Sequence, residues 1–294
     1  MFKKLLLPIL GMILLASLIL FSPKKKYEHN LAVCAIFRNE ASYLKEWIDY
    51  HHKALGASHF YLYNNDSTDN YQEVLKPYID KGLVELIDWE SNEQHALRGW
   101  SPDYQDEGPL WNAYTIEAYN DCLHNRALKK AKWVACLDVN EYIVPTHAVD
   151  TFQSLLKKFS IKLPFHSIGT LKMHWRVFAS PPPSKSTKNT PLVQQSSLRA
   201  KDNHGWHRKK TRSIHRPEAI DVCLLYDAKL KKPFKAKDIS CRKVNIHHYL
   251  LGLEKRIQKG CIRERFFEKV PEIHQQFTCV EDRTIDQYLP LLED

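Results

Sequence analysis

The stretch Leu31-Ala-Val-Cys-Ala-Ile-Phe37-Arg38-Asn-Glu40 joins an unbroken apolar run to a polar end. Seven consecutive apolar residues are typical of a strand that is covered on both faces of a sheet. A second run of this kind, Lys132-Trp-Val-Ala-Cys-Leu137, leads into Asp138-Val-Asn-Glu141. Both segments therefore predict buried strands that end in polar side chains.

Segments with helical periodicity lie between these strands. Their apolar side chains recur every three or four residues, and Gly56 and Gly82 follow two of them as stop signals. The segments are residues 40–55, 71–79 and 111–123. Further strand-like runs are 59–63, 83–88, 168–178 and 244–249, and a last helix is predicted at 251–259. Strands that alternate with helices favour an α/β fold with a mostly parallel, doubly wound sheet flanked by helices.

Polar clusters follow three of the predicted strands directly. They are residues 38–40, 65–69 and 138–141. The carboxyl ends of parallel strands meet at one edge of a sheet, and ligands of open α/β sheets bind beyond that edge. The sequence therefore predicts a binding site where the three clusters converge.

Asp138 and Asn140 place a carboxylate and an amide two residues apart at a strand end. Mn²⁺ and Mg²⁺ prefer oxygen ligands of these types. A later histidine and the oxygens of a diphosphate would complete an octahedral site. The alternative interpretation is an acidic turn that caps the next element.

The formal net charge of +9 is unevenly distributed along the 294 residues. Residues 1–26 carry +5, residues 27–150 carry −10 and residues 151–294 carry +14. This pattern predicts an anchor with basic flanks followed by two halves of one domain. With 44% hydrophobic and 26% charged residues, a mostly disordered chain is excluded.

The segment from Leu5 to Ser22 is apolar and uncharged, and it is close to the length that spans a bilayer. We expect a retained single-pass anchor, and hence a membrane location, with a cleaved signal peptide as the alternative. Lysines flank the segment on both sides, so they leave the orientation open. The compartment also stays open between a Golgi-type lumen and a bacterial inner membrane.

The densest basic cluster comprises Arg208, Lys209, Lys210 and Arg212. Such a run predicts a solvated face, and contact with a phosphate is the alternative. No helix-turn-helix or RNA-binding signature accompanies it, so a nucleic-acid partner is not expected. The seven cysteines form no C-x-x-C pair, which disfavours a zinc ribbon. Cys34 and Cys136 fall in apolar runs and are predicted to be buried.

Several spaced motifs occur in order along the first half of the chain. They are residues 34–40, Leu44-x-Glu46-Trp47-Ile48-x-Tyr50-His51, residues 56–69, Ala118-Tyr-Asn-Asp-Cys122 and residues 133–145. The chain thereby resembles glycosyltransferase family 92 over roughly residues 30–260. Looser matches in the second half are Trp175 with Phe178, residues 214–217, and His248-Tyr249 before Gly260.

The resemblance implies a GT-A-like fold that binds a nucleotide sugar and a divalent metal at a D-x-D motif. Asp138 would be the first acid of that motif, and Asn140 stands where the family usually has aspartate. His248 would be the later metal ligand, with adjacent His247 as its rival. The residues implied for the nucleotide are Ala35, Arg38, Glu40, Asn65, Asp66 and Asp69.

The activity implied is that of a membrane-anchored, metal-dependent, inverting hexosyltransferase. It would use Mn²⁺ or Mg²⁺ to move a hexose such as galactose from a UDP-sugar to a glycan or another hydroxyl acceptor. The alternative is a nucleotide-sugar-binding protein of the same fold that is impaired by Asn140. Inversion needs a carboxylate base. The candidates in the second half are Asp202, Glu218 and Asp221.

Overall fold

The computed structural model describes residues 26–90, 110–147, 150–161, 167–179, 191–201, 210–250 and 280–292. The predicted anchor at 5–22, the predicted helix at 251–259 and Asp202 lie outside these ranges. Within them, no helix is long and apolar enough to cross a bilayer.

Four parallel strands form the N-terminal part of the main sheet. In spatial order they are β3 (Val84–Asp88), β2 (His59–Asn64), β1 (His29–Phe37) and β4 (Ala131–Cys136). The pairs β1–β2, β1–β4 and β2–β3 are all parallel. These are the four strands predicted from the apolar runs of the first half, and their parallel pairing agrees with that prediction.

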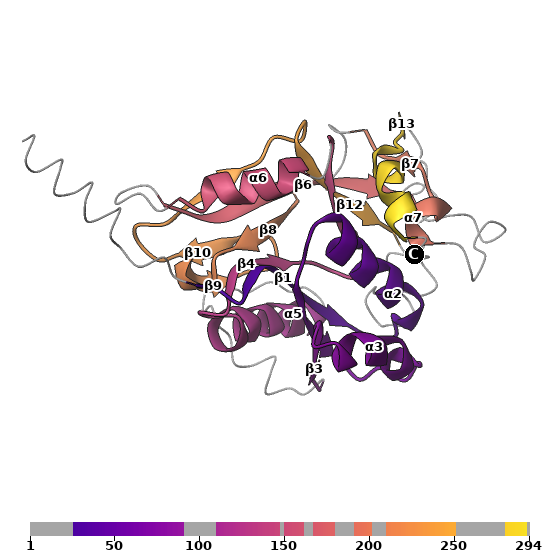
Figure 1. Cartoon of the computed structure of the whole chain (residues 1–294), viewed down its shortest axis with the longest axis horizontal. Helices are drawn as coiled ribbons and strands as arrows, with labels where there is room; N and C mark the ends of the chain where they lie inside the picture. The colour runs from indigo at the N-terminus through magenta and orange to yellow at the C-terminus, as the bar shows by residue number, and fades with distance from the viewer. Residues whose placement is uncertain are drawn as a thin grey trace, which may run out of the picture.

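Helices cover both faces of this sheet, which makes it doubly wound. One face packs against α2 (Ala41–Asp49), α3 (Tyr71–Asp80) and α6 (Asp150–Phe159). The other packs against α5 (Leu110–Asp121). Alternate residues of β1 enter the two cores, since Val33 and Ala35 belong to the first and Ala32 and Cys34 to the second. Figure 1 shows α2 and α3 together, apart from α5.

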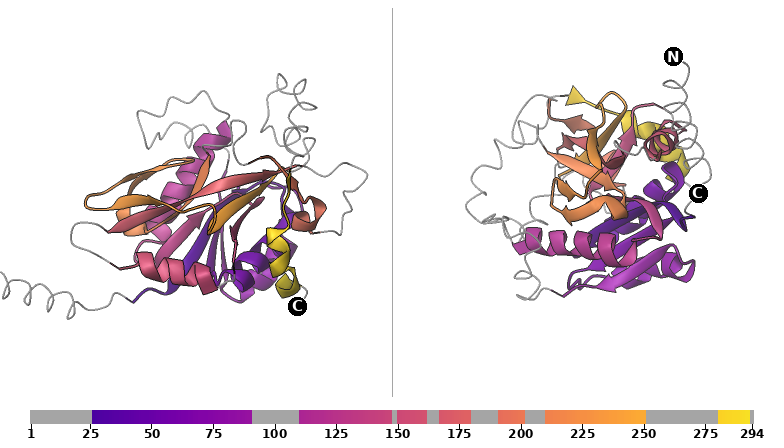
Figure 2. Two further views of the ribbon diagram at one scale, coloured as in Figure 1. Left: turned by 90° about the horizontal axis from the view of Figure 1, so that it is seen from above. Right: turned by 90° about the vertical axis from the view of Figure 1, so that its left-hand side faces the viewer.

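The second half extends the same sheet mostly with antiparallel strands. β8 (Thr211–His215) is antiparallel to both β4 and β6 (Ile168–Phe178). β12 (Val244–Tyr249) runs parallel to β6 and antiparallel to β5 (Glu141–Pro145). The complete sheet is therefore mixed, and the prediction of a mostly parallel sheet holds only for its N-terminal part. Figure 2 shows the orange C-terminal strands beside the indigo and magenta N-terminal ones.

The remaining elements are short. They are the π-helical turns η1 (Tyr50–Ala54) and η2 (Cys122–Arg126), the helix α7 (Leu192–Gln195), the 3₁₀ helices η5 (Pro217–Ala219) and η7 (Thr284–Leu292), and strands β7 (Leu198–Arg199), β9 (Ile220–Cys223), β10 (Ala228–Leu230), β11 (Lys235–Asp238) and β13 (Val280–Glu281). The C-terminal η7 packs on the first half, because Tyr288 stacks edge-on against Tyr50 and donates to the carbonyl of Pro145 at 2.9 Å.

Candidate functional site at the carboxyl edge of the sheet

The three predicted polar clusters lie at the same edge of the sheet. Two hydrogen bonds join the loops after β1 and β2. The side-chain oxygen of Asn39 accepts from the backbone amide of Thr68 at 2.7 Å, and the backbone amide of Asn39 donates to the Ser67 hydroxyl at 3.0 Å. The segment after β4 begins beside β1, where the Leu137 amide donates to the Cys34 carbonyl at 3.0 Å. The topology thus brings residues 38–40, 65–69 and 138–141 together.

Two residues predicted to contact the nucleotide have roles in holding these loops. The Asp69 carboxylate accepts from the amide of Ala41, the first residue of α2, at 2.8 Å. That bond satisfies one of the amides that a helix N-terminus leaves unpaired. The amide of buried Asn65 donates to the Trp89 carbonyl at 2.8 Å, which ties the loop after β2 to the end of β3.

The other residues predicted for the nucleotide differ in exposure. Ala35 lies inside β1 with its side chain fully buried in the core. Arg38 and Glu40 are partly exposed, and Asp66 is exposed with a left-handed backbone at φ +52°. Asp66 is therefore the charged side chain of this set that a ligand could reach most directly, and Arg38 and Glu40 are accessible in part.

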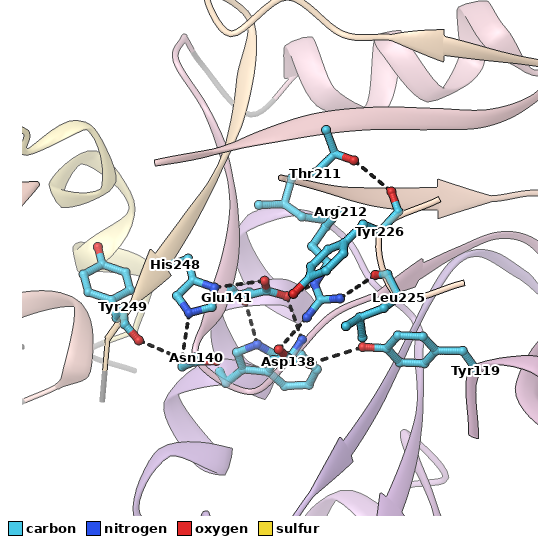
Figure 3. A network of polar contacts seen from close by, with 12 residues as sticks. Tyr119, Asp138, Asn140, Glu141, Thr211, Arg212, Leu225, Tyr226, His248 and Tyr249 are labelled. Atoms are coloured by element: carbon cyan, nitrogen blue, oxygen red, sulfur yellow. Dashed lines mark hydrogen bonds and ion pairs between the residues drawn. The ribbon is translucent and has the colours of Figure 1, made fainter. Parts of the chain in front are cut away.

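Glu141 is the centre of a buried polar network (Figure 3). Its carboxylate accepts from the Asp138 amide at 2.8 Å, from Arg212 Nε at 2.6 Å and from His248 Nδ1 at 3.1 Å. Burial raises the pKa of this carboxyl, but the charge of Arg212 and the hydrogen bond from His248 outweigh it, and the net pKa is lowered. Glu141 therefore stays ionised although its side chain is 0% exposed.

Arg212 links Glu141 to the first acid of the metal motif. Its Nη2 forms an ion pair with the Asp138 carboxylate, and its Nη1 donates to the Leu225 carbonyl at 2.7 Å. The guanidinium is only 2% exposed and lies near the ring faces of Trp175 and Tyr226. The expectation of a solvated basic face is therefore wrong for Arg212, because two carboxylates compensate its charge inside the protein.

Asn140 and His248 meet on the other side of Glu141. The side-chain amide of Asn140 donates to the backbone carbonyl of Tyr249 at 2.7 Å. In return, the backbone carbonyl of Asn140 accepts from the backbone amide of Tyr249 at 3.0 Å. Asn140 Nδ2 also lies 3.4 Å from His248 Nε2. Asn140 thereby fixes the end of β12, the strand that carries His248.

The hydrogen bond to Glu141 sets the tautomer of His248. An ionised carboxylate can only accept, so Nδ1 carries the proton and Nε2 presents a lone pair. His247 points the other way, toward the ring of Phe178 at 4.6 Å between centroids. Of the two rival histidines, His248 is therefore the one that lies with Asp138 and Asn140.

The donor set of Asp138, Asn140 and His248 suits a hard divalent cation. Metal-bound histidines commonly donate their other ring nitrogen to a carboxylate, and the Glu141–His248 contact has that form. The Asp138 side chain keeps 29% of its surface exposed, so a ligand can reach it. The positive charge of Arg212 offsets one of the two nearby carboxylates, Asp138 and Glu141. The remaining negative charge, together with that of a diphosphate, would attract a divalent cation.

Two of the three predicted base residues lie at the opposite edge of the sheet. Glu218 accepts from Arg216 Nη2 at 3.0 Å and from Tyr27, which precedes β1, at 2.9 Å. Asp221 lies beside His124, in the turn that leads into β4. Neither is therefore near Asp138, and Asp202 is outside the described residues.

The sequence reasoning missed the roles of Arg212 and Tyr119. Tyr119 projects from α5 and donates to Asp138 Oδ1 at 3.3 Å, although its helical spacing marked it only as a core residue. Arg212 was hidden among other basic residues. The strand Thr211-Arg-Ser-Ile-His215 holds a single aliphatic residue, so neither an apolar run nor alternation marks it in the sequence.

Comparison with known proteins gives the family of the chain. The model of glycosyltransferase family 92 matches residues 29–290. A glycosyltransferase family 92 protein of Oryza sativa subsp. japonica is 26% identical over 230 residues, which are 76% of this chain and 34% of that protein. The chain belongs to glycosyltransferase family 92. The two relatives that match most of this chain are much longer proteins, and the matched region is about a third of their length.

Two further similarities are more limited. The galactan beta-1,4-galactosyltransferase GALS2 of Arabidopsis thaliana is 32% identical over 123 residues, which cover 41% of this chain and 21% of that protein. Among solved structures, that of S. aureus TarS in complex with UDP aligns with a TM-score of 0.40 at 12% identity, covering 75% of this chain and 60% of that one.

Proposed function

We propose that this protein is a metal-dependent hexosyltransferase that transfers a sugar from a UDP-sugar donor to a glycan hydroxyl. The observation that carries the proposal is the Asp138–Arg212–Glu141–His248 network at the carboxyl edge of the sheet, next to the joined loops after β1 and β2. Family membership supports the reaction class. The edge position supports a GT-A-like arrangement of donor and metal.

The nucleoside would bind over the loops after β1 and β2, where Arg38 and Asp66 are accessible. The diphosphate would then extend toward Asp138. Arg212 lies in ion-pair contact with Asp138, so its positive charge is close to the expected position of the leaving diphosphate. A fixed cation there would stabilise the negative charge that develops on that group as the sugar departs.

Asp138, Asn140 and His248 would hold a divalent cation, Mn²⁺ or Mg²⁺. When bound, the cation supplies Lewis-acid stabilisation of the diphosphate oxygens. Glu141 supports this role by keeping the proton of His248 on Nδ1, and Asn140 supports it by fixing the backbone of Tyr249. The Glu141 contact preorganises His248 in the free protein.

The acceptor side of the proposal rests on the relatives. The similarity to galactan beta-1,4-galactosyltransferases favours galactose as the sugar and a galactan-like glycan as the acceptor. Inversion at the anomeric carbon requires a base near the acceptor hydroxyl. Glu218 and Asp221 lie too far from Asp138 to act as this base. Of the three predicted candidates, Asp202 is therefore the one that we propose. Anchoring by residues 5–22 would place this reaction at a membrane surface.

A donor-hydrolysis assay tests the proposal. The full chain in detergent is incubated with Mn²⁺ and, in turn, UDP-galactose, UDP-glucose and UDP-N-acetylglucosamine, and UDP release is measured. We expect release that needs the cation and is lost in Asp138→Asn. Asp80→Asn, which removes an exposed carboxylate of α3, is the matched control and should retain activity. Tight binding of UDP without release from any donor would instead support a binding protein that lacks turnover.

A further inference from the structure

Three side chains of metal-ligating types meet in the core on the α5 face of the sheet. They are Cys136 of β4, His215 of β8 and Cys223 of β9, and one ligand atom from each lies within 4.8 Å of the others. All three residues are buried, with exposures of 3% or less. The proposed sugar transfer uses none of them.

The imidazole of His215 is oriented toward the sulfur atoms. Its Nδ1 lies 2.9 Å from the hydroxyl of buried Thr170, and its Nε2 lies 3.8 Å from Cys223 Sγ. Thr170 can accept the Nδ1 proton, which leaves a lone pair on Nε2 facing the thiols. A hydrogen bond to the distal nitrogen is the usual support of a metal-bound histidine.

The backbone of Cys223 is also held in place. Asn120 of α5 accepts from the Cys223 amide and donates to the Cys223 carbonyl, both at 2.8 Å. In tetrahedral zinc sites, Zn–S bonds of about 2.3 Å and Zn–N bonds of about 2.0 Å separate sulfur from nitrogen by roughly 3.5 Å. The distance of 3.8 Å between His215 Nε2 and Cys223 Sγ is close to that value.

Cys34 is the registered neighbour of Cys136 across the β1–β4 pair, but the cluster whose ligand atoms all lie within 4.8 Å of one another does not include it. We propose that Cys136, His215 and Cys223 bind one zinc ion in the core of this protein. Thiolate and imidazole ligands in tetrahedral arrangement select zinc over the hard cations proposed for the edge. The thiol protons are released to solvent when the ion binds.

The ion would join strands that carry the edge site. β4 supplies Cys136 and leads to Asp138, and β8 supplies both His215 and Arg212. Zinc at this position would therefore crosslink the two strands whose residues form the Asp138–Arg212 ion pair. Its role would be structural, because the site is closed on all sides by the core.

Metal analysis of the full chain tests the inference. The protein is produced with added Zn²⁺, purified without a metal-affinity tag, dialysed and analysed for zinc by mass spectrometry. We expect about one equivalent per chain and an X-ray absorption spectrum with Zn–S scattering at about 2.3 Å and an imidazole contribution. Thr170→Val, which removes the support of His215 without changing the side-chain volume much, should weaken zinc retention against a chelator by roughly 10- to 100-fold.

Cysteine variants supply the controls. Cys223→Ser should lose the zinc, whereas Cys122→Ser, a buried cysteine of the same core outside the cluster, and Cys241→Ser, an exposed one, should keep it. Wild-type protein that is folded, holds less than a tenth of an equivalent and shows all its thiols free after denaturation would overturn the proposal, as would a disulfide between Cys136 and Cys223. These readouts on the wild type do not depend on the variants folding or on sugar transfer.

Discussion

Arg212 Nε lies 2.6 Å from Glu141 Oε2, and both side chains are almost completely buried. The same guanidinium contacts the carboxylate of Asp138, so one arginine compensates two acids at the edge of the sheet. This arrangement explains how the Glu141 carboxylate can stay ionised next to a core, where its pKa is lowered. It also makes the edge depend on a residue of the second half of the chain.

Removal of Arg212 should destabilise the fold. Arg212→Met leaves Glu141 buried without its cation, and breaking a buried pair in this way costs about 3–5 kcal/mol. Urea unfolding would measure this loss. The double variant Arg212→Met/Glu141→Gln should recover part of it, because the uncompensated charge is removed as well. Arg283→Met, which removes an exposed pair with Glu281, should change little. Equal stability of the single and double variants would contradict this account.

Asn140→Asp should not restore a better metal site. The Asn140 amide is the donor to the Tyr249 carbonyl at 2.7 Å, and a carboxylate cannot donate there. Loss of that bond, with two acceptors brought together, should cost about 1–3 kcal/mol in unfolding free energy. It should also lower the rate of UDP release, because His248 loses its fixed strand end. A variant with unchanged stability and faster release would show instead that the motif had decayed.

Asp69→Ala separates a structural role from a role in donor binding. Asp69 accepts from the first amide of α2, and loss of a helix cap of this type costs about 0.5–2 kcal/mol. Thermal unfolding would show this shift. Asp66→Asn removes an exposed charge of the same loop and keeps a side chain that tolerates the left-handed backbone, so it should change stability less than Asp69→Ala while weakening UDP binding, measured by calorimetry. A loss of stability in the Asp66 variant and a loss of UDP binding in the Asp69 variant would contradict these two assignments.

The N-terminal half of the fold was predictable because its signals are local. Unbroken apolar runs marked β1 and β4, and helical periodicity marked α2, α3 and α5. The polar residues after β1, β2 and β4 could be placed together because parallel strands end at one edge. Asp138 and Asn140 were found in this way.

The residues that complete the edge come from antiparallel strands far along the chain. β8 reaches Asp138 through a pairing of residues 134–136 with 213–215, which leaves no periodic signal in a five-residue strand. The same distance in sequence hid Cys136, His215 and Cys223, because no spacing rule joins residues on separate strands. Sequence patterns thus gave the scaffold and one side of the site, and tertiary pairing supplied the other.

Two buried histidines should make the protein acid-sensitive well above the range in which carboxyl groups titrate. Burial lowers the pKa of His51 to about 4 and that of His247 to about 3, against 6.5 for the unfolded chain. Neither ring nitrogen of His247 has a hydrogen-bond partner among the described residues, so its neutral form is held by the apolar rings of Phe178 and Tyr249. Protonation therefore favours the unfolded chain.

Because the unfolded chain binds more protons below pH 6.5, the stability from these histidines is present in full above that pH and is lost as the pH falls toward 4. Each histidine should contribute a loss of ~2 kcal/mol between pH 7 and pH 5. Urea unfolding at these two pH values would measure the total difference, to which His29, His59 and His124 also contribute because their pKa values are lowered. His247→Phe keeps a ring against Phe178 and removes the titrating group, so it should reduce the difference by ~2 kcal/mol, while wild type and variant should show parallel curves above pH 7.5. An undiminished difference in His247→Phe would mean that His247 takes up its proton in the folded protein.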